Sequence, residues 1–296
     1  MLKKLYNQSG LRVLHGIFEA KNMRKRMVKE GLQSIDDLPV SDYKTSDTLF
    51  ILGSGYSITQ LTQSQWEQIR QHDSIGFNSW MFHEHTPTYF AIETPMVPQH
   101  FNGMVNELNR KKEAYENVPF IIQYQHYLRS PNRYTNLELP KENVYFNAPL
   151  MPYTTSRRVL ELLLSWWEKR HRKKMSWLLH YAGSLSYMIA MGYVMNYKKI
   201  ILLGVDLNDP RYFFEHPNSN EFTKKFAAIH KAILKRANRS GLDTVNSKIT
   251  KTYGCLPIDE YLYKFNGILK KQGVTLYSGN KNSKLAEGLP IYEFPK

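Results

Sequence analysis

Residues 49–58 read Leu-Phe-Ile-Leu-Gly-Ser-Gly-Tyr-Ser-Ile and are the clearest indication of fold class in this chain. Four apolar residues run directly into a turn of small residues, which is typical of a buried parallel strand and its following loop in an open α/β sheet. Glycine lets such a loop turn sharply and bring its backbone N–H groups close to an anion. The segment therefore favours a phosphate-binding loop. An ordinary tight turn is the alternative, because the third glycine of the dinucleotide fingerprint and the lysine of a P-loop are missing.

Segments with strand and helix patterns alternate along the rest of the chain. Short apolar runs rich in β-branched and aromatic residues predict strands, and apolar residues three and four positions apart predict helices. The alternation favours a mostly parallel, Rossmann-like α/β sheet with helices on both faces. We expect a basic helical segment over residues 1–45 and a single α/β domain over residues 46–296. The predicted strands cover residues 47–52, 73–78, 88–92, 119–122, 144–146, 199–205 and 274–277, and the predicted helices cover residues 64–72, 183–193 and 222–239.

Composition sets outer bounds on the function. With 296 residues and 42% hydrophobic content, the chain can bury a sizeable core, which excludes wholesale disorder. The single cysteine, Cys255, excludes an intramolecular disulfide framework and fits a reducing compartment. The first residues, Met-Leu-Lys-Lys-Leu-Tyr-Asn, do not resemble a secretory signal, and no apolar run is long enough to span a membrane. We therefore expect a cytoplasmic protein.

The formal net charge of +14 indicates an anionic partner. Lys and Arg gather in three runs, at residues 21–29, 169–174 and 224–239. The second run follows Trp166 and Trp167 and precedes Trp177, and such rings beside cations suit the interface of an anionic membrane. A solvated basic helix face and a nucleic-acid surface are the alternatives, although no standard nucleic-acid motif is present. We expect a protein that binds no nucleic acid and lies peripherally on the inner face of the cytoplasmic membrane.

Polar side chains stand at the carboxyl ends of several predicted strands. In an open α/β sheet, ligands bind at this edge. Each residue has an ordinary alternative, since Asn78 and Asp206 can cap helices and Glu93 can be a loop charge. Several such coincidences at the same relative position favour one shared pocket. The residues are Ser54, Asn78, Glu93, Asp206 and Asn282.

Several short motifs occur in a characteristic order. They are residues 51–58 with the glycine loop, residues 77–82 with Asn78, residues 183–193 followed by 199–206, and residues 276–285. Together, in patches over residues 48–292, they resemble the bacterial sialyltransferases of glycosyltransferase family 42. The resemblance implies a GT-A-like variant of the α/β fold and a CMP-activated sugar donor. It implies donor-binding roles for Gly53, Ser54, Gly55, Tyr56, Ser57, Asn78, Gly183, Ser184, Ser186, Asn208, Tyr212, Asn282 and Ser283, with the tyrosine on the phosphate.

One part of that family pattern is missing. The resemblance implies a general-base histidine shortly before the helix that leads into the last strand, and Cys255 and Leu256 stand there instead. His216 is the nearest upstream substitute, as a base or a phosphate partner. Glu93 and Asp206 are further catalytic candidates, as carboxylate nucleophile or base. Some bacterial β-Kdo transferases, which also use a CMP-sugar, are related to this fold and retain configuration, so the stereochemical outcome stays open.

No metal and no cofactor are expected. The chain lacks an Asp-x-Asp motif of the kind that holds a divalent ion in nucleotide-diphosphate sugar transferases, and Asp206-Leu-Asn-Asp209 is a poor copy of it. A monophosphate leaving group carries less charge than a diphosphate, so side chains can neutralise it. His83 and His85 have a spacing seen in metal sites, but two histidines on an exposed loop are the commoner reading.

These observations lead to one functional hypothesis and two alternatives. We expect a glycosyltransferase that moves a ulosonic acid, sialic acid-type or Kdo, from a CMP-activated donor to a glycan or glycolipid acceptor. The setting would be the biosynthesis of bacterial lipopolysaccharide or capsule. One alternative is a nucleotide-dependent hydrolase or modifying enzyme with the same cleft. The other is a non-catalytic basic protein that binds nucleic acid or membrane.

Overall fold

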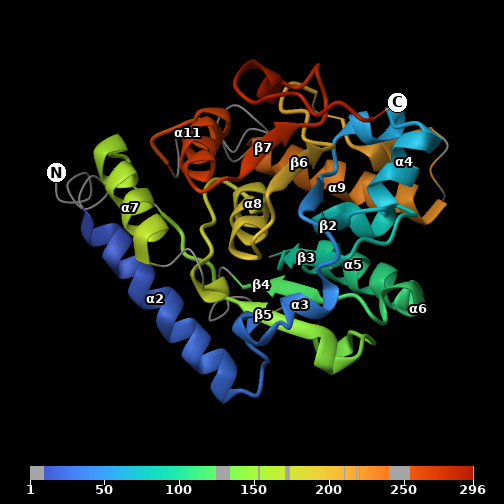
Figure 1. Ribbon diagram of the computed structural model, residues 1–296. Helices are drawn as coiled ribbons and strands as arrows, with labels where there is room; N and C mark the ends of the chain where they lie inside the picture. The colour runs from blue at the N-terminus through green and yellow to red at the C-terminus, as the bar shows by residue number, and fades with distance from the viewer. Residues whose placement is uncertain are drawn as a thin grey trace.

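The computed structural model describes residues 10–295, except Met96, residues 125–133, Tyr153, residues 171–173, Pro210, Asn218, Asn220 and residues 240–253. The described residues contain one seven-stranded sheet in the order β5-β4-β3-β2-β1-β6-β7, and all neighbouring strands are parallel (Figure 1). The predicted parallel sheet is confirmed. The strands are β1 (Thr48–Leu52), β2 (Asp73–Phe77), β3 (Tyr89–Glu93), β4 (Phe120–Gln123), β5 (Val144–Asn147), β6 (Lys199–Leu203) and β7 (Thr275–Ser278).

The strand order places a crevice beside β1. The chain builds outward from β1 to β5 on one side and then returns to add β6 and β7 on the other, so the winding reverses between β1 and β6. At such a reversal the two loops leave the carboxyl edge in opposite directions, which makes room for a ligand. Leu52 at the end of β1 is paired with Leu203 of β6 and with Gly76 of β2. The candidate site begins directly after these residues.

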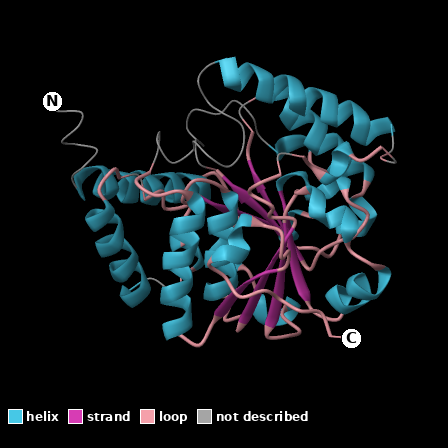
Figure 2. Ribbon diagram, turned by 90° about the horizontal axis from the view of Figure 1, so that it is seen from above, coloured by secondary structure: helices cyan, strands magenta, loops and turns pink. Residues whose placement is uncertain are grey.

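Helices cover both faces of the sheet, as the sequence predicts (Figure 2). All five residues of β1 are buried, which explains why this strand is an unbroken apolar run. On one face, Leu49 and Ile51 belong to a cluster with residues of α7 (Arg157–Arg170), α8 (Ser184–Val194) and α11 (Ile258–Lys271). On the other face, Phe50 and Leu52 pack with residues of α4 (Gln63–Arg70), α5 (Pro98–Arg110), α6 (Lys112–Tyr115) and α9 (Glu221–Arg239).

Helix α8 lies very close to the centre of the sheet. A Cβ atom at Gly192 would lie 2.7 Å from a side-chain carbon of Leu49 and 3.2 Å from one of Ile200, so glycine is required for this approach. The helix runs back toward the start of β6, and its N-terminal end therefore lies at the carboxyl edge of the sheet. This packing fixes Ser184, the first residue of α8, at the candidate site.

The N-terminal segment packs on the sheet domain. Helix α2 (Gly10–Lys29) buries one side against the protein and is followed by α3 (Val40–Tyr43). Between the two helices, the carbonyl oxygen of Gln33 accepts a hydrogen bond from the backbone N–H of Phe146 on edge strand β5, at 2.8 Å. Within the predicted basic segment of residues 1–45, the structure thus has a helix at residues 10–29, and residues 1–9 lie outside the described residues. Among the residues that the structure describes, no helix is long and apolar enough to cross a membrane.

The tryptophans near the second basic run are buried to different degrees. Trp167 is 0% exposed, and its indole N–H donates a hydrogen bond to the carbonyl oxygen of Trp177 at 2.7 Å. Trp166 and Trp177 are part-buried and pack against the core. The Trp167 ring thus anchors α7 to the core and is not available to a lipid interface, whereas an interfacial role for the other two rings stays a prediction. Residues 171–173 of the run lie outside the described residues.

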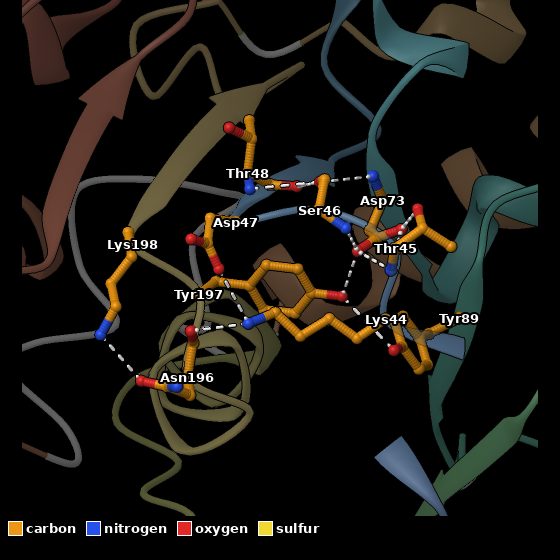
Figure 3. Close-up of polar contacts among 10 residues, drawn as sticks. All are labelled: Lys44, Thr45, Ser46, Asp47, Thr48, Asp73, Tyr89, Asn196, Tyr197 and Lys198. Atoms are coloured by element: carbon orange, nitrogen blue, oxygen red, sulfur yellow. Dashed lines mark hydrogen bonds and ion pairs between the residues drawn. The ribbon is translucent and has the colours of Figure 1, made fainter. Parts of the chain in front are cut away.

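Asp73 organises the amino-terminal edge of the sheet (Figure 3). It is 1% exposed, and its carboxylate accepts hydrogen bonds from the backbone N–H groups of Thr45 and Ser46, both at 3.0 Å. The hydroxyls of Thr45 and Tyr197 also donate to it, at 2.6 Å and 2.9 Å. Burial raises the pKa of Tyr197, so its phenol stays protonated as a donor. This network lies at the edge opposite the candidate site.

Asp73→Ala is expected to lower the free energy of unfolding by about 3 kcal/mol, because four donors lose a buried charged acceptor. Chemical denaturation measures the change. Asp47→Ala is the matched control, since the Asp47 side chain is 70% exposed and forms a surface ion pair with Lys44 at 3.1 Å. That control should change the free energy by less than about 1 kcal/mol. Equal effects of the two substitutions would contradict the structural role given to Asp73.

Candidate active site

The glycine loop after β1 packs directly against the turn after β6. The N–H of Gly53 donates to the carbonyl oxygen of Leu203 at 2.8 Å, and the N–H of Gly55 donates to that of Gly204 at 2.7 Å. A Cβ atom at Gly53 would lie 2.5 Å from the Gly204 oxygen, so the two turns can touch only where this side chain is absent. These two N–H groups therefore join the turns together. This corrects the expectation that they face a phosphate.

Asp206 connects three loops at this edge and is 5% exposed. Its Oδ2 accepts a hydrogen bond from the backbone N–H of Ser57 at 2.9 Å, and its Oδ1 accepts one from the side-chain amide of Asn280 at 3.0 Å. A Cβ atom at Gly55 would lie 2.5 Å from the same Oδ2. Both carboxylate oxygens thus hold loops in place. These contacts favour a positioning role for Asp206 over the predicted role of nucleophile or base.

Asn208, Asn282 and Ser283 lie around the same turn. The side-chain amide of Asn208 donates to the carbonyl oxygen of Asn282 at 2.8 Å, and the hydroxyl of Ser283 donates to a backbone carbonyl after β6 at 2.7 Å. The sequence did not predict Asn280, whose side-chain oxygen accepts a hydrogen bond from the N–H of Asn282 at 2.9 Å. Asn280 links these three predicted residues to Asp206.

Two cavities lie next to the residues that hydrogen-bond to Asp206, and the smaller one is lined by Asp206 itself. The larger has a volume of about 440 Å³ and lies between residues 57–65, the ends of β6 and β7, and residues 291–294. The smaller, of about 180 Å³, has a polar lining made of Ser57, Gln60, Asp206, Asn208, Asp209, Asn280 and Asn282. Ligand pockets typically measure roughly 300–1,000 Å³, so the larger cavity alone is in the range of a nucleoside. The glycine loop thus borders a space in which a nucleotide fits.

Residues 211–216 fold back over the glycine loop. Gly55 and Tyr212 form an antiparallel bridge, and the N–H of Phe213 donates to the carbonyl oxygen of Ser54 at 3.0 Å. Burial raises the pKa of Tyr212 to about 12, so its hydroxyl is protonated at neutral pH and can donate to an anion. The backbone of the predicted phosphate tyrosine therefore lies against the predicted donor loop, while its ring packs on Phe214 and against His230, both at 4.9 Å between ring centres.

Arg211 adds a cation that the sequence did not predict. Its guanidinium carbon lies 4.1 Å from the centre of the Tyr56 ring, and its side chain is 58% exposed while paired with Asp209 at 2.6 Å. His216 is close by, with its ring centre 6.1 Å from that of Tyr56. An exposed guanidinium held against the Tyr56 ring of the glycine loop is suited to binding phosphate.

A second polar group lies at the ends of β2 and β3 and centres on Glu93. The Ser184 hydroxyl donates to Oε2 of Glu93 at 2.9 Å, and Nε2 of His180 lies 3.6 Å from the same oxygen. Asn78 joins these residues, because its Oδ1 accepts from the N–H of Glu93 at 2.9 Å and its Nδ2 donates to Ser184 at 3.3 Å. The Glu93 side chain is 36% exposed, whereas that of His180 is 5% exposed. Glu93 is thus an accessible carboxylate in an ordered network.

Unusual backbone conformations gather at this edge. The described non-glycine residues with positive φ are Asn78 (51°), Ala182 (54°), Asn196 (64°) and Leu207 (50°). Asn78 belongs to the Glu93 network, Ala182 comes two residues before Ser184, and Leu207 directly follows Asp206. Such conformations are costly and cluster at functional sites. Gly183 has a φ of 139°, a backbone conformation that requires glycine. Glycine at this position therefore has a structural role in addition to its predicted role in binding the donor.

Ser186 supports the turn before α8 from the inside. Its hydroxyl oxygen accepts from the N–H of Tyr181 at 2.7 Å and donates to the carbonyl oxygen of Tyr181 at 2.9 Å, and the residue is 0% exposed. These contacts favour a structural role over the predicted donor contact. The Tyr181 hydroxyl in turn bonds to the backbone N–H and carbonyl of Leu256, both at 2.8 Å. Leu256 belongs to the segment in which the family resemblance implies a histidine. This segment therefore lies against Tyr181, the residue that follows His180.

Two more polar residues continue the line of Glu93 across the sheet. The strand register pairs Glu93 with Gln123 of β4, and Gln123 with Asn147 of β5. Both are 0% exposed, and the Asn147 amide donates to the hydroxyl of Tyr187 at 3.0 Å, whereas neither side-chain amide atom of Gln123 has a hydrogen bond to a residue that the structure describes. The predicted strands end one residue short of both. Glu93 was predicted by the rule that a polar residue follows a buried strand. The same rule predicts Gln123 and Asn147 when each predicted strand is lengthened by one residue.

The candidate site therefore consists of two polar groups on neighbouring strand ends. The first surrounds Asp206 and contains the glycine loop, Tyr212 and the turn after β7, with His216 beside it. The second surrounds Glu93 and contains Asn78, Ser184 and His180. Glu93 and Asp206, the two predicted carboxylates, each belong to a separate hydrogen-bonded group.

His83 and His85 form no metal site with other residues. Within the described ranges, no group of three or more His, Cys, Asp and Glu residues is placed to hold a metal ion. The ring of His83 stacks on Trp80 at 4.4 Å between centres, and burial lowers the pKa of His83 to about 3 and that of His85 to about 4. Both are neutral residues of an aromatic cluster with Trp66, not histidines of an exposed loop.

Comparison with protein families and with curated proteins gave no match. Among solved structures, the chain is similar to the monofunctional α-2,3-sialyltransferase Cst-I from Campylobacter jejuni, with 16% identity, coverage of 84% of this chain and 83% of that chain, and a TM-score of 0.43. It is also similar to an α-2,3-sialyltransferase from Campylobacter jejuni in apo form, with 14% identity, 84% and 80% coverage, and a TM-score of 0.40. A third is the sialyltransferase CstII from Campylobacter jejuni with the substrate analogue CMP-3FNeuAc, with 15% identity, 82% and 85% coverage, and a TM-score of 0.43. These proteins are sialyltransferases, the group that the sequence motifs resemble.

Proposed function

We propose that the protein is a glycosyltransferase that moves a ulosonic acid, sialic acid-type or Kdo, from a CMP-activated donor to a hydroxyl of a glycan or glycolipid. The observation that carries the proposal is the carboxyl edge of the sheet. A cavity of about 440 Å³ is lined there by Ser57 and Asn280, the two donors to Asp206, and the Glu93 network lies at the ends of β2 and β3. The motifs that build this edge are those that resemble the family 42 sialyltransferases. We place the reaction in the assembly of bacterial lipopolysaccharide or capsule, at the cytoplasmic side of the membrane.

In this proposal the nucleoside occupies the larger cavity, and the phosphate lies near Arg211 and Tyr212. The guanidinium charge and the protonated phenol stabilise the phosphate as negative charge develops on it during departure. Helix α8 points its N-terminal end toward the Glu93 network, and Gly183 provides no side-chain cap to its first N–H groups. These groups suit the carboxylate that every ulosonic acid carries next to its anomeric carbon.

Glu93 is the residue best placed for chemistry at the sugar. As a base, it takes the proton of the acceptor hydroxyl, whose oxygen bonds to the anomeric carbon while CMP leaves with the electrons of the broken bond. This path inverts the anomeric configuration. As a nucleophile, the Glu93 carboxylate bonds to the anomeric carbon while CMP leaves with the electrons of the broken bond. The acceptor oxygen then displaces the carboxylate and gives its proton to the released CMP phosphate or to water, which retains configuration. Product stereochemistry, read by NMR, distinguishes the two paths.

CMP is expected to raise the melting temperature by about 5 °C at 100 times its Kd, because a ligand that binds only the folded state stabilises it by about 2.7 kcal/mol. Differential scanning fluorimetry with CMP, UMP and GMP at equal concentrations provides the test. UMP and GMP should give much smaller shifts. Equal shifts from all three nucleotides would contradict a cytidine-selective site.

Incubation with a panel of CMP-activated ulosonic acids and a generic acceptor tests the reaction itself. We propose that transfer needs no divalent ion, since Arg211 and Tyr212 can neutralise a single phosphate, so rates should be equal in EDTA and in Mg²⁺. Release of CMP at the same rate with and without acceptor would identify a hydrolase instead. Absence of both CMP binding and turnover would refute the proposal.

A further inference from the structure

Helix α2 presents an apolar stripe to the outside of the protein. Leu11, Leu14 and Phe18 are 61%, 61% and 62% exposed, and their spacing of three and four residues places them on one side of the helix. The opposite side of α2 is buried against the protein. Large apolar side chains that are exposed singly are ordinary, but three in a row mark a contact surface. Figure 1 shows α2 at the periphery of the molecule.

The same stripe continues along α2 as a row of cations. Lys21, Lys25 and Lys29 follow Phe18 at helical spacing and are all exposed. The sequence of α2, Gly-Leu-Arg-Val-Leu-His-Gly-Ile-Phe-Glu-Ala-Lys-Asn-Met-Arg-Lys-Arg-Met-Val-Lys, contains six Lys and Arg residues and a single acidic residue, Glu19. One outward side of the helix therefore has an apolar half and a strongly basic half.

We infer that this stripe of α2 docks the protein on an anionic lipid surface. Leu11, Leu14 and Phe18 would enter the boundary between headgroups and acyl chains, while the lysines meet lipid phosphates. The combination of apolar and positively charged side chains favours an anionic lipid surface as the partner. A nucleic acid would match the cations but leave the three apolar side chains in water, and an apolar protein groove would leave the lysines unmatched. The surface differs from the tryptophan-flanked run that the sequence suggested.

The inference rests on the proposed function only in that docking would bring the site to a lipid-linked acceptor. The docking itself is measured without any substrate, so it can fail while CMP binding and transfer to a water-soluble acceptor succeed. The reverse also holds, because vesicle binding in a protein without CMP response would refute the proposed reaction and leave the docking surface in place.

Co-sedimentation with vesicles of phosphatidylcholine and phosphatidylglycerol, compared with phosphatidylcholine alone, provides the test. The full chain should bind the anionic vesicles preferentially. The triple variant Lys21→Gln, Lys25→Gln and Lys29→Gln should partition on the order of 100-fold more weakly, since each cation near an anionic surface adds about a factor of five. The double variant Leu14→Ser and Phe18→Ser should lose at least about tenfold on the same vesicles. Because all five side chains are exposed, the variants should keep the melting temperature of the parent.

A matched control removes three lysines from other helices. The variant Lys224→Gln, Lys225→Gln and Lys271→Gln carries the same charge change on exposed positions of α9 and α11. It should partition like the parent protein. Equal losses in the control and the α2 variants would show a nonspecific charge effect and overturn the inference. So would unchanged vesicle binding in both α2 variants, salt-dependent retention on duplex DNA that the lysine variant abolishes without any vesicle binding, or a dimer that Phe18→Ser dissociates.

Discussion

Glu93→Gln is expected to reduce kcat for sugar transfer by about 1,000-fold while leaving the fold intact, since positioned acid–base groups contribute about 10²–10⁴-fold to rates. Glutamine keeps the size of the side chain, and its oxygen can still accept the hydrogen bond of Ser184. What it lacks is the negative charge that takes a proton or attacks the anomeric carbon. The measurement is kcat at saturating donor and acceptor. The melting temperature and the response to CMP should match those of the parent protein.

The control for this prediction is Glu67→Gln, which removes the same charge from an exposed position on α4. That variant should turn over normally. Ser184→Ala tests the network around Glu93 and should lower kcat by about tenfold, because one hydrogen bond that orients the carboxylate is lost. Near-normal turnover of Glu93→Gln would remove this residue from the chemistry and leave the proposed mechanism without its central group.

The sheet was predictable because its strands are buried on both faces. Burial on both faces leaves no polar alternation, so the β1 and β6 segments stand out as unbroken apolar runs. The error at the end of β6 has a physical cause. Val205 continues the apolar pattern, which extends the predicted strand to residue 205, but Gly204 has a φ of 63° and turns the chain away after Leu203. Backbone conformation, which the apolar pattern does not contain, ends this strand.

The edge at which the site lies was also predictable, but the role of each side chain was not. Asn78, Glu93 and Asp206 were located by one rule, that polar residues follow buried strands at the ligand edge. The rule does not say which carboxylate is bonded on both oxygens and which is accessible. The rule also does not predict His180, which lies in the turn before α8 and contacts Glu93 only because α8 packs on the sheet.

The proposed membrane-docking surface was likewise only partly predictable, because the sequence shows the spacing of residues but not how the helices pack. Trp166 and Trp167 are adjacent in sequence, but adjacent positions on a helix point about 100° apart. One of the two rings, that of Trp167, is therefore directed into the core, and the sequence alone did not give the side that α7 buries. The stripe on α2 is different, since its three apolar and three basic residues share one spacing. Only the structure shows which side of α2 is buried, and therefore that these six side chains are exposed.

Asp206 has contacts that predict a different kinetic result from that of Glu93. Its two oxygens accept hydrogen bonds from Ser57 and Asn280, which belong to the loop after β1 and the turn after β7. In Asp206→Asn, one oxygen becomes an NH₂ group, so one of these two donors faces another donor. Hydrogen bonds to a charged group are each worth about 1.5–3 kcal/mol, and the loops around the nucleotide cavity should loosen by a comparable amount.

Asp206→Asn is therefore expected to raise KM for the CMP-sugar donor by roughly 10–100-fold and to lower kcat by less than about tenfold. Steady-state kinetics with donor as the varied substrate measures both, and the thermal shift caused by CMP should decrease in parallel. Asp42→Asn, at an exposed position on α3 before the amino-terminal end of β1, is the matched control and should leave both constants unchanged. If instead kcat decreases as much as in Glu93→Gln while KM stays constant, Asp206 acts in the chemical step. The hydrogen bonds from Ser57 and Asn280 would then orient a reactive carboxylate, since each of its oxygens has a second lone pair that can meet the substrate.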